Sequence, residues 1–115
     1  MDTKAHAEAI AATVPQSVGF DPVTIVTILT QVLPLIVGCF KRNDQSDPNA
    51  VKAEVARQNA SHPEALQRRT ARRIRGEADQ SMSKDQATAL AVATINHCLN
   101  SDDVEVASYC AGVAE

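Results

Sequence analysis

The stretch DPVTIVTILTQVLPLIVGCF, residues 21–40, is the only long apolar run in this chain of 115 residues. Asp21 and Pro22 are typical of a helix start, because a carboxylate caps the first turn and proline fits the first helical position. The β-branched residues that follow would also suit a strand, but the length and the Asp-Pro start favour a helix. We therefore predict a helix over about 22–40, kinked at Pro34 where one backbone hydrogen bond is missing.

Twelve of the last eighteen residues of this stretch are strongly apolar. Five of the other six recur at spacings of three and four, which places them in one narrow seam along the helix. Small and polar residues in such a seam allow close approach of a second helix and hydrogen bonds across the contact. Alternatively, the hydroxyl groups bond back to the helix's own carbonyl groups. The first interpretation predicts an oligomer interface formed by Thr24, Thr27, Gln31, Pro34 and Gly38.

The rest of the chain is typical of short, capped helices. Ser61 with Glu64 and Ser83 with Gln86 match the capping-box pattern, in which two side chains satisfy the first backbone donors of a helix. The chain is one domain by its length. The fold class that we predict is all-α: a single domain over residues 1–115, with a small bundle of about five or six helices around the apolar helix 22–40. The other helices are expected over 3–14, 48–59, 64–79, 84–99 and 103–113.

Aromatic residues make up only 3% of the chain, and alanine is abundant. A core of this composition predicts helices that approach each other closely. Most of the predicted helices carry thin, alanine-rich stripes that bury little surface. We therefore expect helix 22–40 to need a second chain to cover it. The one broad stripe is on helix 84–99 and contains Ala87, Leu90, Ala91, Thr94, Ile95 and Cys98.

Five arginines crowd one wide face of the predicted helix 64–79, opposite an apolar face. Guanidinium groups bind carboxylate and phosphate as planar forks, so this face is a candidate contact for an acidic partner or another anion. A solvated face that pairs with nearby acidic residues is the alternative. Net charge −3 and the lack of interleaved aromatic residues argue against nucleic acid. The arginines are Arg68, Arg69, Arg72, Arg73 and Arg75.

No catalytic or cofactor motif is present in the sequence. There is no glycine-rich phosphate loop, no GxSxG, and no CxxC or HxxxH pair that would indicate a metal site. We therefore expect no catalytic residues, no metal and no cofactor. Cys39, Cys98 and Cys110 cannot all pair within one chain, and we interpret them as buried thiols in a reducing compartment.

These observations favour a non-enzymatic structural or assembly protein, a helical subunit that self-associates or docks into a larger complex. Its contacts would be helix 22–40 and the arginine face, and its location the cytoplasm or an assembled particle such as a virion. A single-pass membrane or pore-forming protein with residues 23–40 spanning is the first alternative. A nucleic-acid-binding helical module that uses the arginine face is the second.

Overall fold

The computed structural model describes residues 3–40, 48–101 and 106, with side chains over 3–35, 49–101 and at 106. Within these ranges the chain forms five α-helices, one short 3-10 helix and no strand, as the predicted all-α class requires. Of the predicted helix over 103–113, the structure describes only Val106, which is buried; the other residues of this range lie outside the described part. The elements are α1 (Thr3–Ala11), the 3-10 helix η1 (Gln16–Val18), α2 (Pro22–Phe40), α3 (Pro48–Ser61), α4 (Pro63–Glu77) and α5 (Lys84–Asn100).

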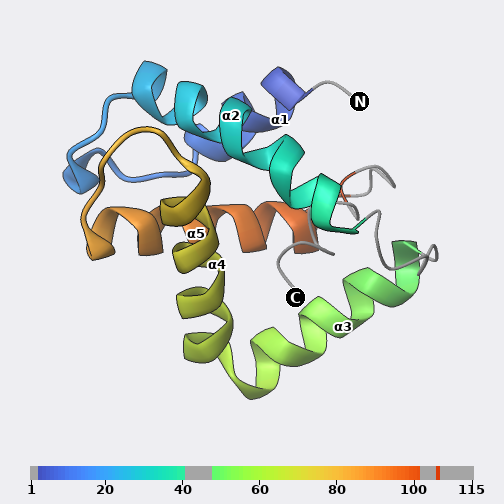
Figure 1. Ribbon diagram of the computed structural model, residues 1–115. Helices are drawn as coiled ribbons and strands as arrows, with labels where there is room; N and C mark the ends of the chain where they lie inside the picture. Colours follow the sequence, from blue (N-terminus) through green and yellow to red (C-terminus); the bar gives the residue numbers. More distant parts are fainter. Residues whose placement is uncertain (1–2, 41–47, 102–105, 107–115) are drawn as a thin grey trace.

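Helix α5 runs through the middle of the bundle (Figure 1). Helices α1 and α2 pack together on one side of it, α4 crosses it, and α3 lies at the opposite edge. The most extensive contact is between α4 and α5, and that between α1 and α2 is second. Because α5 contacts α1, α3 and α4, its broad apolar stripe is the surface on which much of the bundle is assembled.

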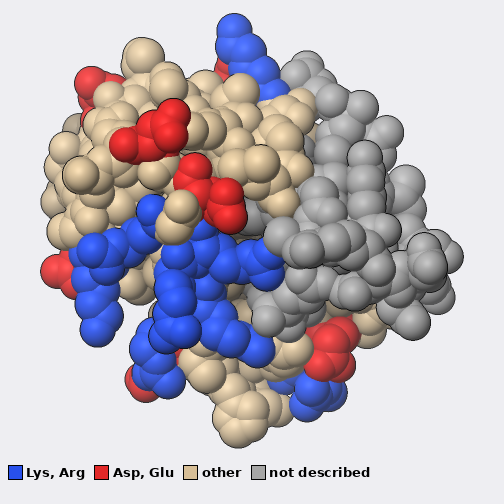
Figure 2. Space-filling view, in the orientation of Figure 1, with Lys and Arg blue, Asp and Glu red and all other residues tan. Residues whose placement is uncertain are grey.

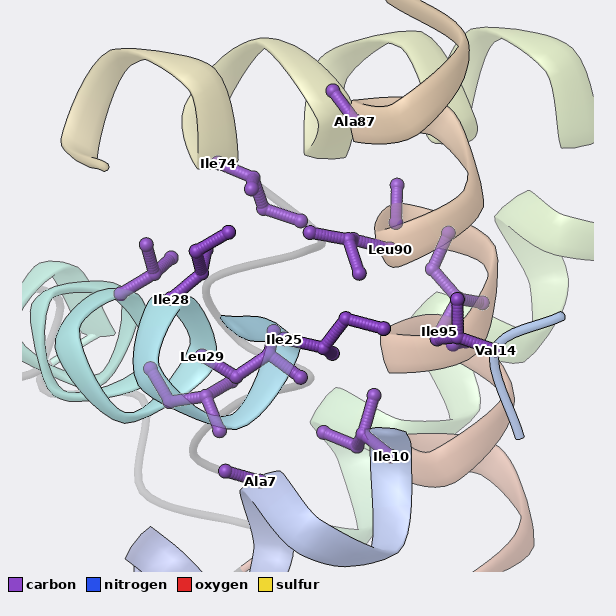
Figure 3. Packing of buried hydrophobic residues seen from close by; sticks show 14 of the residues in the cluster. Ala7, Ile10, Val14, Ile25, Ile28, Leu29, Ile74, Ala87, Leu90 and Ile95 are labelled. Atoms are coloured by element: carbon purple, nitrogen blue, oxygen red, sulfur yellow. The ribbon is translucent and has the colours of Figure 1, made fainter. Parts of the chain in front are cut away.

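Helix α2 is two-faced over its described side chains, and one copy of the chain covers its apolar face. Ile25, Ile28 and Leu29 are at most 2% exposed, and Val32 and Leu33 are fully buried. These positions recur at spacings of three and four, which places them on one face of the helix. Figure 3 shows this face pointing toward side chains of α1, α4 and α5. Our expectation that the thin stripes of the other helices could not cover α2 is therefore wrong for the described part.

Alanine makes this coverage possible. Six alanines of the core are buried, and the largest fully buried side chains are all isoleucine, leucine or valine. A methyl side chain keeps two helix backbones close, so larger aliphatic side chains elsewhere reach a common centre. In Figure 3, Ile10, Ile25, Ile74 and Leu90 converge there from four helices. The expected stripe on α5 is confirmed, since all six of its residues are buried.

Two of the predicted helix starts are confirmed in atomic detail. The backbone N–H of Thr24 donates to Asp21 Oδ1 at 2.7 Å. At the start of α5, the N–H of Gln86 donates to Ser83 Oγ at 3.1 Å, and the N–H of Ser83 donates to Gln86 Oε1 at 2.9 Å. The amide of Gln86 also donates to the carbonyl of Val18 at 3.2 Å, so this cap ties η1 to α5.

The predicted capping box of Ser61 with Glu64 is wrong. Ser61 is the last residue of α3, and the N–H of His62 still donates to the carbonyl of Gln58 at 2.7 Å. Pro63 excludes His62 from the α region, so α4 begins at Pro63 without a side-chain cap.

Helix α1 ends at Ala11 rather than at the expected Val14. Beyond Ala11 the backbone makes shorter-range bonds, from the N–H of Thr13 to Ile10 and from that of Val14 to Ala11. The hydroxyl of Thr13 also donates to the carbonyl of Ile10 at 2.8 Å, which competes with a regular helical turn. Pro15 then keeps Val14 out of the α region.

Helix α2 continues through Pro34 to Phe40, and the kink at Pro34 stays a prediction. Over the described ranges, none of the helices is both long enough and apolar enough to cross a membrane.

Replacing Asp21 with alanine is expected to lower the melting temperature at neutral pH, because the N–H of Thr24 loses its acceptor. The bond from that N–H lowers the pKa of Asp21. A carboxyl group with a lowered pKa stabilises the fold above its ordinary pKa, near 3.8, and loses this effect as the pH falls through the lowered value.

The measurement is a series of thermal melts of the wild type and Asp21→Ala between neutral and strongly acidic pH. The difference between the two proteins should disappear at acidic pH. Glu54 also contributes a pH-dependent stability, because its bond with Arg57 lowers its pKa to about 2. This contribution is the same in both proteins and therefore cancels in the difference between them. A difference that stays constant at all pH values would contradict the capping role.

Candidate anion-binding groove between α4 and α5

The five arginines of α4 lie in two stripes rather than on one common face. Arg68, Arg72 and Arg75 are exposed and line the same groove. Arg69 points away from that groove and donates to the side-chain carbonyl of Gln58 on α3. Arg73 is half-buried. The separation follows from helix geometry, because residues one position apart point about 100° apart.

The groove lies in the corner between α4 and the first turns of α5. Its volume is about 520 Å³. Helix α4 contributes the three arginines, and α5 contributes Lys84 and Thr88. Ala71 and Gly76 also line the groove, and a β-carbon added at Gly76 would meet no other atom within 4 Å. Figure 2 shows the basic side chains gathered in one patch over α4 and the start of α5, with acidic side chains at its edges.

The cations of this groove are not neutralised within the described residues. Neither the three arginines of the groove nor Lys84 forms an ion pair there. Arg57 on α3 is the contrast, because both nitrogen atoms of its fork bond to Glu54, at 2.6 and 2.9 Å. Four positive charges therefore face one small volume, and an anion bound there would interact with all of them at short range.

The groove offers hydrogen-bond donors almost exclusively. Arginine and lysine have no acceptor atoms. The hydroxyl of Thr88 already donates to the carbonyl of Lys84 at 2.8 Å, which leaves its oxygen as the one side-chain acceptor. A ligand must therefore supply acceptor oxygens, and carboxylate or phosphate groups supply them in the planar pairs that guanidinium forks match.

Sequence reasoning found the arginines but missed the other wall of the groove. Lys84 and Thr88 lie on a different helix, and no local pattern indicates that α5 turns its start toward this stripe. The angular positions of the five arginines around α4, at about 100° per residue, already distinguish Arg68, Arg72 and Arg75 from Arg69 and Arg73.

The predicted seam on α2 lies on the outer side of this helix. Thr27 and Pro34 are exposed, while Thr24 and Gln31 are half-buried. The hydroxyl of Thr27 donates to the carbonyl of Val23 at 2.9 Å, which is the alternative that we considered for these threonines. Gln31 accepts a bond from the N–H of Asp79 at 3.2 Å and so joins α2 to the loop after α4.

Gly38, the fifth residue of the seam, has no described surroundings. Close to the seam, Val23 is 76% exposed and Leu35 is 44% exposed. These two residues are twelve positions apart, and at about 100° per residue they point in directions about 120° apart. The described part of α2 therefore carries separate exposed apolar side chains rather than one continuous apolar face.

A pair of histidines, His6 and His97, joins α1 to α5, and no pattern in the sequence predicts this contact. His6 Nδ1 lies 2.9 Å from His97 Nε2, and the two rings meet edge to face with centroids 5.2 Å apart. One ring donates and the other accepts, so the bond fixes α1 against α5. No local pattern relates two residues 91 positions apart.

Within the residues that the structure describes, no three His, Cys, Asp or Glu side chains come together as a metal site. Comparison with known proteins identifies no relative: no family model matches, and no similar curated protein or solved structure was found. The groove between α4 and α5 is therefore the feature on which a functional proposal rests.

Proposed function

We propose that this protein is a non-enzymatic helical subunit that docks into a larger protein complex, with the groove between α4 and α5 holding an acidic segment of its partner. The observation that carries the proposal is the set of four cations, Arg68, Arg72, Arg75 and Lys84, around one groove without ion pairs among the described residues. An assembled particle such as a virion, or a cytoplasmic complex, is the setting in which such a subunit would work.

An acidic protein segment fits these observations better than nucleic acid does. The net charge of the whole chain, −3, disfavours binding of a long polyanion, which would also meet acidic residues beyond the groove. The groove is also short and contains no aromatic side chain on which a base could stack. A short acidic segment can contact the four cations without extending over the acidic residues around the groove.

Reversing the three groove arginines tests the proposal. The variant Arg68→Glu/Arg72→Glu/Arg75→Glu should bind fluorescent poly-glutamate at least about 100-fold more weakly than the wild type, since like charges then line the groove. Wild-type binding should weaken steeply with salt. Fluorescence anisotropy measures both effects, and circular dichroism checks that the variant stays helical.

A matched pair of single variants distinguishes binding in the groove from a general effect of net charge on binding. Arg72→Glu and Arg69→Glu change the net charge equally on the same helix, but only Arg72 lines the groove. The proposal requires that Arg72→Glu clearly weakens the binding of poly-glutamate and that Arg69→Glu changes this binding little. Equal losses, or tighter binding to a DNA duplex than to poly-glutamate at equal salt, would contradict it.

Self-association through the outer side of α2 is a second proposal, which the exposure of Val23 favours. The contact would include Thr24, Thr27, Gln31, Pro34 and Gly38. Light scattering coupled to size exclusion, without detergent, should then report a discrete oligomer, and Val23→Asp should return it to a monomer. A wild-type protein that is monomeric at all concentrations would contradict this proposal and leave the groove proposal intact.

A further inference from the structure

The chain itself contains an acidic segment suited to the groove between α4 and α5. Residues 85–115 include five acidic residues and no lysine or arginine. Three of the five, Asp102, Asp103 and Glu105, fall within four consecutive positions shortly after α5, and we call them the acidic cluster. No other four consecutive positions of the sequence hold three acidic residues. Positive charge on α4 and negative charge after α5 are therefore separated along the chain.

The acidic cluster cannot fill the groove of its own copy. It begins one position after Ser101, whose carbonyl accepts a bond from Lys52 Nζ on α3. Lys84 and Thr88, the wall of the groove on α5, stand 17 and 13 positions before Ser101, which is about 25 Å and about 20 Å along the helix. Four residues extend at most about 14 Å beyond Ser101. Because Val106 on the other side of the cluster is buried in the core, both ends are held, and a cluster that occupies the groove must come from another molecule.

The acidic cluster and the arginine stripe agree in number and in extent. Arg75 follows Arg68 by seven positions on α4, or about 10 Å. The three positions from Asp102 to Glu105 span at most about 10 Å in any conformation, so the three carboxylates fit along the stripe. Guanidinium groups pair with carboxylates through charge-assisted hydrogen bonds, and Lys84 adds a fourth positive charge.

We propose that the groove of one copy binds the acidic cluster of a second copy of this chain. This inference rests on the proposed function and names its partner. The two surfaces in contact differ, so each pair of copies keeps one free groove and one free cluster. The contact then repeats from copy to copy, and it gives a closed ring or an open filament according to the rotation between neighbours.

Light scattering coupled to size exclusion tests this contact with two variants. The cluster variant, Asp102→Asn/Asp103→Asn/Glu105→Gln, removes the charges and keeps the size of the side chains. The groove variant is the triple arginine-to-glutamate variant described above. Both are made in a Val23→Asp background, which removes the contact proposed on α2. At low ionic strength the Val23→Asp chain should grow in mass with concentration, and each variant should associate at least about tenfold more weakly.

Mixing the two variants is the decisive measurement. The cluster variant keeps an intact groove, and the groove variant keeps an intact acidic cluster. An equimolar mixture should therefore form heterodimers of one copy each, which cannot grow further because the remaining groove and the remaining cluster are both altered. A mixture that stays monomeric, although the cluster variant still binds poly-glutamate, would overturn the inference.

A peptide experiment does not depend on the folding of any variant of the cluster. A labelled peptide with the sequence of residues 101–106 should bind the wild type at low ionic strength about tenfold tighter than its counterpart with Asn, Asn and Gln at the three acidic positions. Arg72→Glu should weaken binding of the acidic peptide, and Arg69→Glu should change it little. Equal binding of the two peptides in fluorescence anisotropy would contradict recognition of the acidic cluster.

The outcomes separate this inference from the proposed function. Growth in mass that persists unchanged in the cluster variant would overturn the second copy as the occupant of the groove. A Val23→Asp chain that stays monomeric at low ionic strength while still binding poly-glutamate would do the same, and both results would leave an acidic partner in place. Failure of poly-glutamate to bind the wild type at low ionic strength would overturn the proposed function itself.

Discussion

Replacing Leu29 with alanine is expected to lower the free energy of unfolding by about 3 kcal/mol. Leu29 is fully buried on the apolar face of α2, among the largest buried side chains of the core. Its removal loses the transfer free energy of the deleted atoms and leaves a cavity between helices that are held apart by neighbouring side chains. Urea denaturation followed by circular dichroism measures the change.

Leu35→Ala is the matched control for this prediction. The substitution deletes the same atoms from the same helix, but Leu35 is 44% exposed. Its cost should stay below about 1 kcal/mol, because much of the side chain is in water in the folded state. If Leu29→Ala lowers the free energy of unfolding no more than Leu35→Ala does, Leu29 is not buried between α2 and the other helices as described above.

Enlarging Ala91 to leucine is expected to destabilise the protein by about 2 kcal/mol. Ala91 is fully buried on α5, the helix against which α1, α3 and α4 pack. The added atoms have no space unless helices move apart, and a core this dense resists such movement. The substitution therefore tests whether small side chains set the distance between helices, a role that hydrophobicity alone does not reveal.

Ala89→Leu provides the comparison on the same helix. Ala89 is half-buried and lines a separate open hollow of about 570 Å³ near His97. A leucine there has room, so the free energy of unfolding should stay within about 0.5 kcal/mol of that of the wild type. Thermal melts of the two variants measure the contrast in stability. Similar losses at both sites would contradict overpacking at Ala91, because leucine is nearly as good a helix former as alanine and its helix propensity costs little at either site.

Most of the helices were predictable because their signals are local. The Asp21 cap, the Ser83–Gln86 capping box and the stripe on α5 each depend on residues within a few positions of one another. The failures also have local causes. The sequence around Ser61 fits a capping box equally well, but His62 can still close the last turn of α3, and only the competition between the two conformations decides.

The candidate site was predictable in part. Arginines at positions 68, 72 and 75 share one helix face, and that much follows from their spacing. Their partner Lys84 was not predictable, because its place depends on how α4 crosses α5. The same holds for the bond between His6 and His97, which joins residues 91 positions apart.

The sequence by itself determined that the chain is all-α, where most of its helices begin, and which faces of α4 and α5 are apolar. Periodicity and capping act over a few residues, so they are readable without a structure. The tertiary structure decided how α2 is covered, since alanines on other helices let them approach it closely. It also decided that the stripe of Arg68, Arg72 and Arg75 meets Lys84 in a groove while Arg69 bonds to Gln58 on α3, because crossing angles depend on the packing of the whole core.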